Sequence, residues 1–294
     1  MQGIPIDRRT FAAGVASLAV NSRLLAAAEP RLLAAAESGS DPFGGFQVGV
    51  QTFCWHRFPL RKMLTDVQGL GLHYVELFPG HAPLENSPAE TRQVVKMCLD
   101  HDIKPIAFGV LPFTSDHDAN KKVFEVAAEL GVRSLGADPH WDSFDSLDKL
   151  VEEFQIPIAI HPHGPVRQQL HPWHRAEIIL THIKHHHPQI GTCLDTGHLI
   201  RCAQQPFHIE LDPAEQIRLM GKRNFGIHLK DSNNDTDINV VYGQGELDVQ
   251  SVLRALREVE FDRHISIEHE AHPEDPLPEI GQNVALLKQA VTNI

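Results

Sequence analysis

Cysteine is scarce in this 294-residue sequence: there are four, and no two of them form a CxxC pair. A chain of this length can bury a large apolar core, so it does not need a framework of disulfides. We therefore expect Cys54, Cys98, Cys193 and Cys202 to be free thiols or small buried apolar groups, although export would permit a disulfide.

The sequence also lacks a basic face. Its formal net charge is −12 at pH 7, and it has no basic cluster beyond Arg8-Arg9. Proteins that bind the phosphates of nucleic acids usually have a surface patch of Lys and Arg, so no nucleic acid partner is expected. The remaining composition, 42% hydrophobic and 22% charged residues, is that of a globular protein with a substantial core.

No apolar run in the N-terminal region is long enough to span a membrane. The stretch 12–20 is only mildly apolar and follows Arg8-Arg9 and Phe11, while small residues follow at 26–28. This pattern resembles a twin-arginine export signal, so we expect residues 1–37 to be an export signal with a linker helix and the protein to be periplasmic. The alternative is an Ala/Leu-rich helix kept on a cytoplasmic protein, because RLLAAAE occurs twice, at 23–29 and 31–37.

A glycine-rich phosphate loop is missing as well. Gly243-Gln244-Gly245 does not match one, which disfavours an open, doubly wound nucleotide-binding sheet. Residues 38–45 have the composition of a linker, and after them eight strand-like segments alternate with eight helix-like ones. The expected strands are 46–53, 73–78, 105–110, 132–137, 156–161, 190–195, 225–230 and 264–268. The expected helices are 59–70, 89–102, 117–130, 144–154, 173–187, 212–222, 248–259 and 277–292. This count predicts a single-domain α/β fold, a (β/α)8 TIM barrel over residues 46–294.

Four of the predicted strands run directly into residues that bind metals. The segments are IAIHPHG with His161 and His163, TCLDTGH with Asp195 and His198, GIHLKDS with His228, Lys230 and Asp231, and ISIEHE with Glu268 and Glu270. Parallel neighbouring strands of one barrel end at the same rim, so these side chains are expected to converge. A converging set of His, Asp, His and Glu predicts a divalent-metal site.

Further polar and aromatic residues follow other predicted strands. They are His56, Glu76, His140 and Trp141. The opposite strand ends carry ordinary residues such as Lys104. Because TIM-barrel chemistry sits where strands end, this asymmetry predicts an enzyme.

On these motifs the chain resembles the xylose isomerase-like barrel superfamily of sugar and sugar-phosphate isomerases and epimerases. The most specific parts are CLDTGH (193–198), IHLKD (227–231) and IEHE (267–270), in the family's order and spacing. The resemblance implies one divalent ion (Mn, Mg, Co or Zn), held by a Glu ending strand 5, an Asp ending strand 6, a His ending strand 7 and a Glu ending strand 8. The last three carry over to Asp195, His228 and Glu268.

The first ligand does not carry over, because strand 5 ends here in His161-Pro162-His163. The expected metal ligands are therefore His161, Asp195, His228 and Glu268. In the family the carboxylates of strands 5 and 8 also move the proton. We therefore expect Glu268 to be one catalytic residue, with Glu76 or His161 as its partner. The residues expected to bind substrate are His163, His198, Lys230, His56, His140 and Trp141.

The resemblance implies a metal-dependent isomerase or epimerase that abstracts a proton next to the carbonyl of a keto-sugar and forms an enediolate. The alternative is a keto-sugar or keto-polyol dehydratase or eliminase that uses the same metal site. Less favoured are an endonuclease IV-type phosphodiesterase, which the acidic charge opposes, and a non-catalytic sugar-binding barrel. The expected partner is a small sugar, and family analogy suggests a homo-oligomer.

Overall fold

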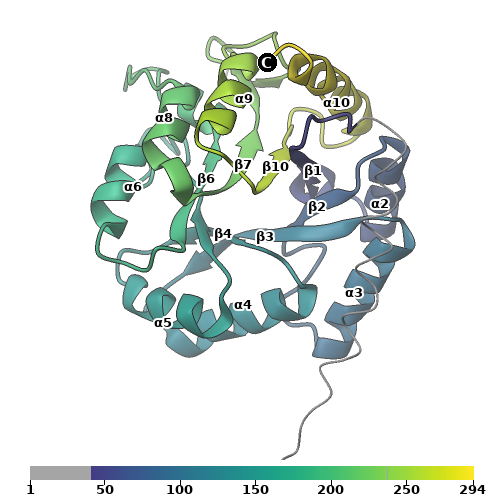
Figure 1. Ribbon diagram of the computed structural model, residues 1–294, viewed down its shortest axis with the longest axis vertical. Helices are drawn as coiled ribbons and strands as arrows, with labels where there is room; N and C mark the ends of the chain where they lie inside the picture. Colours follow the sequence, from purple (N-terminus) through teal and green to yellow (C-terminus); the bar gives the residue numbers. More distant parts are fainter. Residues whose placement is uncertain (1–40, 237) are drawn as a thin grey trace, which may run out of the picture. The chain divides into compact units, whose positions relative to one another are not determined.

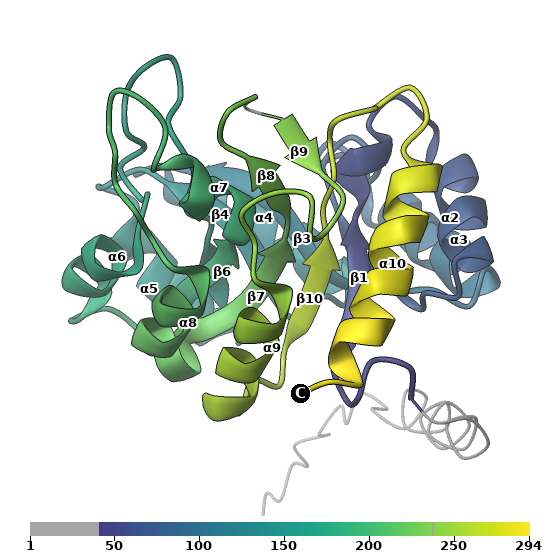
Figure 2. The ribbon, with the colours of Figure 1, turned by 90° about the horizontal axis from the view of Figure 1, so that it is seen from above.

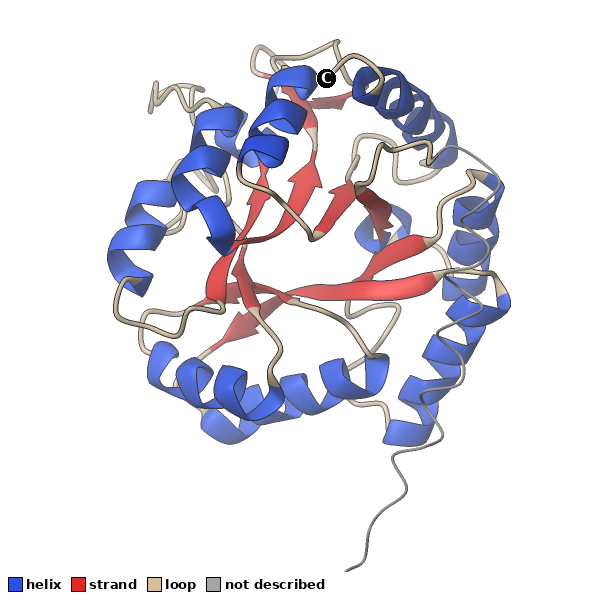
Figure 3. Cartoon of the chain, in the orientation of Figure 1, coloured by secondary structure: helices blue, strands red, loops and turns tan. Residues whose placement is uncertain are grey.

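A closed barrel of parallel strands forms the centre of the protein in the computed structural model, which describes residues 41–236 and 238–294 (Figures 1 and 3). Around the barrel the strands follow the order β1-β10-β7-β6-β5-β4-β3-β2, and β1 pairs with both β2 and β10. The barrel strands are β1 (Gln47–Gln51), β2 (Tyr74–Leu77), β3 (Lys104–Phe113), β4 (Leu135–Pro139), β5 (Ile158–Ile160), β6 (Ile190–Asp195), β7 (Asn224–Leu229) and β10 (His264–Ile267). The predicted (β/α)8 barrel is confirmed.

Helices lie outside the strands and cover the barrel (Figure 3). They are α2 (Leu60–Gly69), α3 (Pro88–Asp100), α4 (His117–Leu130), α5 (Phe144–Phe154), α6 (Ala176–Ile183), α8 (Pro213–Met220), α9 (Val249–Glu258) and α10 (Leu277–Val291). Each corresponds to a predicted helix. The strands of such a barrel are buried on both faces, because helices cover the outer face and side chains fill the interior. Accordingly, every residue of β6, β7 and β10 is buried.

Local sequence signals set several of the helix ends. Ser87 caps α3, with Glu90 completing a capping box and Pro88 in the first turn. Asp248 caps α9 by accepting a hydrogen bond from the Ser251 backbone N–H. At the other end of α4, Gly131 has φ +67°, a left-handed conformation that glycine adopts without steric cost.

Three features differ from the prediction. Helix α6 covers Ala176–Ile183 and not 173–187, because Trp173 is buried in the preceding loop, where its indole N–H donates to the Pro139 carbonyl at 2.8 Å. Strand β3 continues to Phe113 because its last residues pair with β4. The sequence analysis also missed short elements after β6 and β7. These are helix α7 (Thr196–Arg201) and a hairpin formed by β8 (Asp231–Asn233) and β9 (Ile238–Val240).

These short elements stand at the carboxyl ends of the barrel strands, as the side view shows (Figure 2). In such barrels the loops at this end carry the chemistry. None of the helices within 41–236 and 238–294 is long and apolar enough to cross a membrane. The predicted export signal lies outside the described residues, as do residues 38–40 of the predicted linker.

Candidate metal centre and active site

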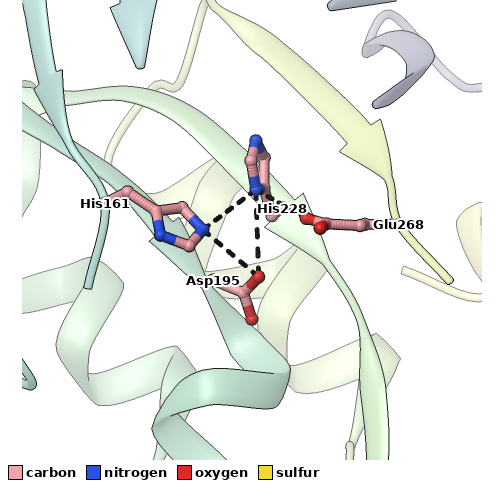
Figure 4. Close-up of side chains that lie close together, drawn as sticks. All are labelled: His161, Asp195, His228 and Glu268. Carbon is pink, nitrogen blue, oxygen red and sulfur yellow. Dashed lines mark hydrogen bonds and ion pairs between the residues drawn. The ribbon is translucent and has the colours of Figure 1, made fainter. Parts of the chain in front are cut away.

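Four side chains from four neighbouring strands converge at the carboxyl end of the barrel (Figure 4). The Nε2 atom of His161 lies 3.1 Å from Nδ1 of His228 and 3.4 Å from Oδ2 of Asp195. The same Nδ1 atom of His228 lies 2.7 Å from Oε2 of Glu268. All four residues are buried, and their ligand atoms lie within 4.8 Å of one another. We call His161, Asp195, His228 and Glu268 the barrel cluster.

The chemistry of this cluster fits a divalent ion. Oδ2 of Asp195 and Oε2 of Glu268 are buried and accept no hydrogen bond from the described residues. Two buried carboxylates that face one point are costly unless positive charge compensates them, so this arrangement favours a bound cation. Two imidazole nitrogens and two carboxylate oxygens directed at one point are a donor set that Zn²⁺, Mn²⁺ or Co²⁺ accepts. The barrel cluster could therefore hold one such ion.

Asp195 uses its two carboxylate oxygens for different purposes. It is the last residue of β6 and also the N-cap of α7, where Oδ1 accepts a hydrogen bond of 2.7 Å from the His198 backbone N–H. This bond fixes the carboxylate and turns Oδ2 toward the barrel cluster. Capping the helix thus orients the metal ligand.

The two residues after Asp195 position Lys230. The Thr196 hydroxyl donates to the Lys230 carbonyl at 2.7 Å and lies 2.9 Å from the Lys230 backbone N–H. A Cβ atom on Gly197 would lie only 2.7 Å from Cγ of Lys230, so the side-chain stem fits only because residue 197 is glycine. In the segment DTGH, Asp195 is therefore a candidate metal ligand, Thr196 hydrogen-bonds to the backbone of Lys230, and Gly197 leaves space for the lysine side chain.

Lys230 is buried in the middle of the acidic groups, with 1% of its side chain exposed. Its Nζ atom lies 3.2 Å from Oδ2 of Asp195, 3.1 Å from Oε1 of Glu268 and 2.7 Å from Oε1 of Glu270. Burial alone disfavours ionisation, but this ammonium lowers the pKa of Asp195 well below its usual value and that of Glu268 to about 2. Conversely, the three carboxylates raise the pKa of Lys230 well above its usual value, despite its burial. Lys230 therefore lies beside the barrel cluster, and its expected role in substrate binding stays a prediction.

Glu76 lies behind His228 within the barrel, which corrects its expected place beside the substrate. Its Oε2 atom accepts hydrogen bonds from Nε2 of His228 at 2.9 Å and from the Ser266 hydroxyl at 2.8 Å, and it lies 3.2 Å from Nε2 of His264. Although burial favours the neutral acid, the imidazoles of His228 and His264 lower the pKa of Glu76 well below its usual value. A carboxylate in this position fixes the orientation of a ring that could ligate a metal ion.

His163 and His198 lie beside the barrel cluster, as the sequence predicts. The His198 ring meets the His161 ring edge-on, with centroids 5.3 Å apart, and His163 stacks on His198 at 3.7 Å. Burial lowers the pKa of His163 to about 4, so its ring is neutral at pH 7. The two rings form a wall on the strand-5 side of the site.

The structure gives His56, His140 and Trp141 partners away from the cluster. His56 stacks on Phe53, and His140 pairs with Asp142 at 2.6 Å. Trp141 packs against Trp173 and His182, with centroids 4.0 and 4.8 Å away. In the part of the chain that the structure describes, none of the three hydrogen-bonds to or stacks on a cluster residue. The geometry therefore gives no support to their expected role in substrate binding, because proximity to a strand end does not fix where a loop side chain points.

Asp231 has a structural role that the sequence analysis missed. The buried carboxylate accepts hydrogen bonds from the backbone N–H groups of Ser232, Gly243, Gly245 and Leu247, at 2.8 to 3.1 Å. It therefore holds the loop after β9 against the end of β7. The glycine turn at 243–245, set against an Asp at a strand end, is the signal that could have identified this contact.

Glu270 was noticed as a strand-end residue but was not assigned to the site. Its carboxylate pairs with Lys230, and its backbone N–H donates to Oδ1 of Asn239 at 3.1 Å. Glu270 thus links the cluster to hairpin β8–β9. Its alternation with Glu268 along the chain is the sequence signal for this position.

Comparison with known proteins agrees with this fold. The family model of the xylose isomerase-like TIM barrel matches residues 64–290. The chain belongs to this family. No curated protein sequence matches it.

Solved structures with the same fold include several epimerases and one uncharacterized protein whose sequence identity to this chain is higher than theirs. A putative uncharacterized protein from Parabacteroides distasonis is 26% identical, with a TM-score of 0.63 and coverage of 83% of this chain and 98% of the other. An L-ribulose 3-epimerase is 15% identical, with a TM-score of 0.66 and coverage of 84% and 95%. A 3-keto-D-glucoside 4-epimerase from E. coli is 14% identical, with a TM-score of 0.64 and coverage of 83% and 99%. These structures are similar to this chain in fold, and the similarity is consistent with an isomerase- or epimerase-like enzyme.

Proposed function

We propose that this protein is a metal-dependent isomerase or epimerase that acts on a keto-sugar or sugar derivative through an enediolate. The observation that carries this proposal is the barrel cluster with the Lys230 ammonium placed between two of its carboxylates. The site thus combines ligands for one divalent ion, an ionised carboxylate and a cationic hydrogen-bond donor. Together these three components suit proton abstraction next to a carbonyl.

The ion, most simply Mn²⁺, Co²⁺ or Zn²⁺, would supply Lewis acidity toward the carbonyl and neighbouring hydroxyl oxygens of the substrate. Glu268 is ionised, as a base must be, and we assign it the removal of the α-proton. Lys230 lies 3.1 Å from Oε1 of Glu268, and we assign its ammonium the electrostatic stabilisation of the substrate oxygen that gains negative charge. His163 and His198 contact the sugar from the strand-5 side.

His161 limits which reactions this set can perform. Its Nε2 atom faces the cluster, so we assign it to metal binding, and a neutral imidazole bound through Nε2 has no second lone pair to accept a proton. Glu76 is committed to His228. Of the described residues expected to move the proton, Glu268 is then the carboxylate that remains, which suits transfer between neighbouring carbons on one face of the substrate.

A lyase is the second candidate, and the replacement of the strand-5 carboxylate by His161 favours it. Epimerisation requires that a proton return to the opposite face of the substrate carbon, and no second carboxylate is assigned to that step. Elimination does not require it. Lys230 could then donate a proton to a leaving hydroxide or alkoxide. The same site would act as a keto-sugar dehydratase or eliminase.

Solvent exchange tests both reactions at the shared first step. Mn²⁺-loaded protein is incubated in D₂O with a panel of ketoses and 3-keto-glycosides and followed by proton NMR. We expect one α-proton signal to disappear, the Glu268→Gln variant to abolish this loss, and the product to distinguish isomerase from lyase. Glu270→Gln is the matched control, because Glu270 also pairs with Lys230 but lies outside the barrel cluster. Absence of exchange with every substrate, in protein that holds metal, would contradict the proposal for this panel.

We also propose export through the twin-arginine route, which carries folded proteins and so would let the enzyme acquire its metal first. The support is the motif at Arg8-Arg9 with Phe11. A periplasmic location favours an unphosphorylated sugar, because phosphorylated sugars are mostly cytosolic. Cell fractionation of the wild type and of the double variant Arg8→Lys, Arg9→Lys tests this. Equal amounts of both proteins in the periplasmic fraction would exclude the route.

A further inference from the structure

A second group of side chains that can ligate a metal comes from α10 and from the loop that joins β10 to α10. It consists of His269, His272 and Glu279, whose ligand atoms lie within 4.8 Å of one another. His269 follows Glu268 directly, yet its ring contacts Glu279 of α10 and no member of the barrel cluster. We call these three residues the loop cluster.

Both rings of the loop cluster point at a single oxygen atom. Nε2 of His269 lies 2.8 Å and Nδ1 of His272 lies 2.7 Å from Oε2 of Glu279. The two nitrogens and the carboxylate oxygen are therefore close enough to one another to share one ion. Two imidazoles and one carboxylate at His-x2-His spacing are a donor set for Zn²⁺, Cu²⁺ or Ni²⁺.

In the loop cluster one histidine is buried and the other is exposed to solvent. His269 has 1% of its side chain exposed, and its backbone N–H donates to Sγ of Cys54 at 3.3 Å. His272 is 57% exposed, which gives an ion access and leaves coordination positions for water. Pro273 and Pro276 restrict the backbone between the ligands, so few conformations are lost when an ion binds.

The surrounding charge also favours a cation. Glu274 and Asp275 lie between the two ends of the cluster, both exposed, and Glu279 carries the carboxylate at its centre. Such a site attracts a divalent ion from solution by the same electrostatics that concentrate counter-ions at acidic surfaces.

We propose that the loop cluster is a second divalent-metal site, in which His269, His272 and Glu279 hold a Zn²⁺-like ion and fix the β10–α10 loop to α10. The ion is structural and takes no part in the reaction assigned to the barrel cluster. This proposal does not depend on the proposed function, because the experiment that tests it measures the number of ions bound and not enzymatic activity.

Zinc titration of the metal-free full-length protein tests the proposal, with isothermal titration calorimetry as the measurement. We expect two Zn²⁺ ions per wild-type chain. The Asp195→Asn variant, which disables the barrel cluster, should keep one. His272→Ala should also keep one, and the variant carrying both substitutions should bind none. Because His272 is exposed, its removal leaves the core intact.

Two further variants sharpen the interpretation. Glu279→Gln keeps a hydrogen-bond acceptor for the imidazoles but removes the anionic ligand, so we expect zinc affinity at the loop cluster to fall about tenfold or more. His185→Ala removes an exposed histidine from the run at 185–187 and should leave the stoichiometry unchanged. The proposal is overturned if Asp195→Asn binds no zinc, if His272→Ala binds as the wild type does, or if His185→Ala loses the second ion.

Discussion

The Oε2 atom of Glu76 lies 2.9 Å from Nε2 of His228, whose other ring nitrogen faces the barrel cluster. Residue 76 is on β2 and residue 228 is on β7, so the contact crosses the interior of the barrel. A carboxylate on Nε2 leaves Nδ1 as the nitrogen that binds metal, and it holds the ring in that orientation. Glu76 is therefore a positioning residue for the site.

Substitution of Glu76 by Gln should weaken metal binding without removing a ligand. The amide cannot supply the negative charge that raises the basicity of His228, so we expect metal affinity to fall about 10- to 100-fold. Competition with a chromophoric chelator measures the affinity. Ser266→Ala is the control, since it removes another hydrogen bond to the same Oε2 atom but leaves the contact with His228. Equal affinity in Glu76→Gln and the wild type would show that Glu76 serves only the packing of the barrel.

Asp195→Asn should retain the fold but lose the metal of the barrel cluster. The amide oxygen can still accept the hydrogen bond from the His198 backbone N–H, so helix α7 keeps its cap. The neutral side chain is a poor ligand, and we expect enzymatic activity to fall at least about 100-fold. Metal content after dialysis and the circular dichroism spectrum are the two measurements. Full occupancy of the barrel cluster in folded Asp195→Asn would show that Asp195 is not a ligand.

Replacing Lys230 by Met should strengthen metal binding while it lowers activity. The ammonium sits 3.2 Å from Asp195 and 3.1 Å from Glu268, so it competes with a divalent ion for the same carboxylates. Without metal, the variant leaves buried carboxylates unpaired and should be less stable by about 3–5 kcal/mol. Metal should then raise the melting temperature more in the variant than in the wild type. A smaller rise in Lys230→Met would contradict this account of the lysine.

A methyl group at position 197 should disturb the site through Lys230. In Gly197→Ala the new Cβ would lie 2.7 and 2.8 Å from Cγ and Cδ of Lys230, so the lysine stem must move. We expect a loss of about 1–3 kcal/mol in the free energy of unfolding, together with reduced activity. Urea denaturation measures the stability. Gly69→Ala provides a comparison, because a Cβ at residue 69 would have no heavy atom within 4 Å.

The four cysteines should be unreactive in the folded protein. All are free and buried, and burial raises the pKa of Cys98 and Cys193 to about 12 and that of Cys202 to about 11. Because the thiolate is the reactive form, we expect negligible reaction with Ellman's reagent at pH 8 and four thiols after denaturation. A count of two after denaturation would reveal a disulfide.

Much of the fold and of the cluster was readable from the sequence. Apolar segments of strand length that alternate with helical ones specify a (β/α)8 barrel, because parallel strands need crossover helices. Ligand residues at the ends of these strands must then meet, since parallel strands finish at one rim. This geometry predicts that the four strand ends converge, the family resemblance selects Asp195, His228 and Glu268 as ligands, and the structure brings these three together with His161.

Only the tertiary structure decided what the remaining residues do. Glu76 and Lys230 both follow the strand pattern, yet one lies behind a ligand and the other lies among the carboxylates. His140 and Trp141 follow a strand end too, but their loop turns them toward other partners. Strand periodicity determines which face a residue occupies, and it carries no information on depth within the barrel or on loop conformation. Those depend on contacts between residues far apart in the chain, such as Glu76 with His228, and these contacts exist only once the barrel has closed.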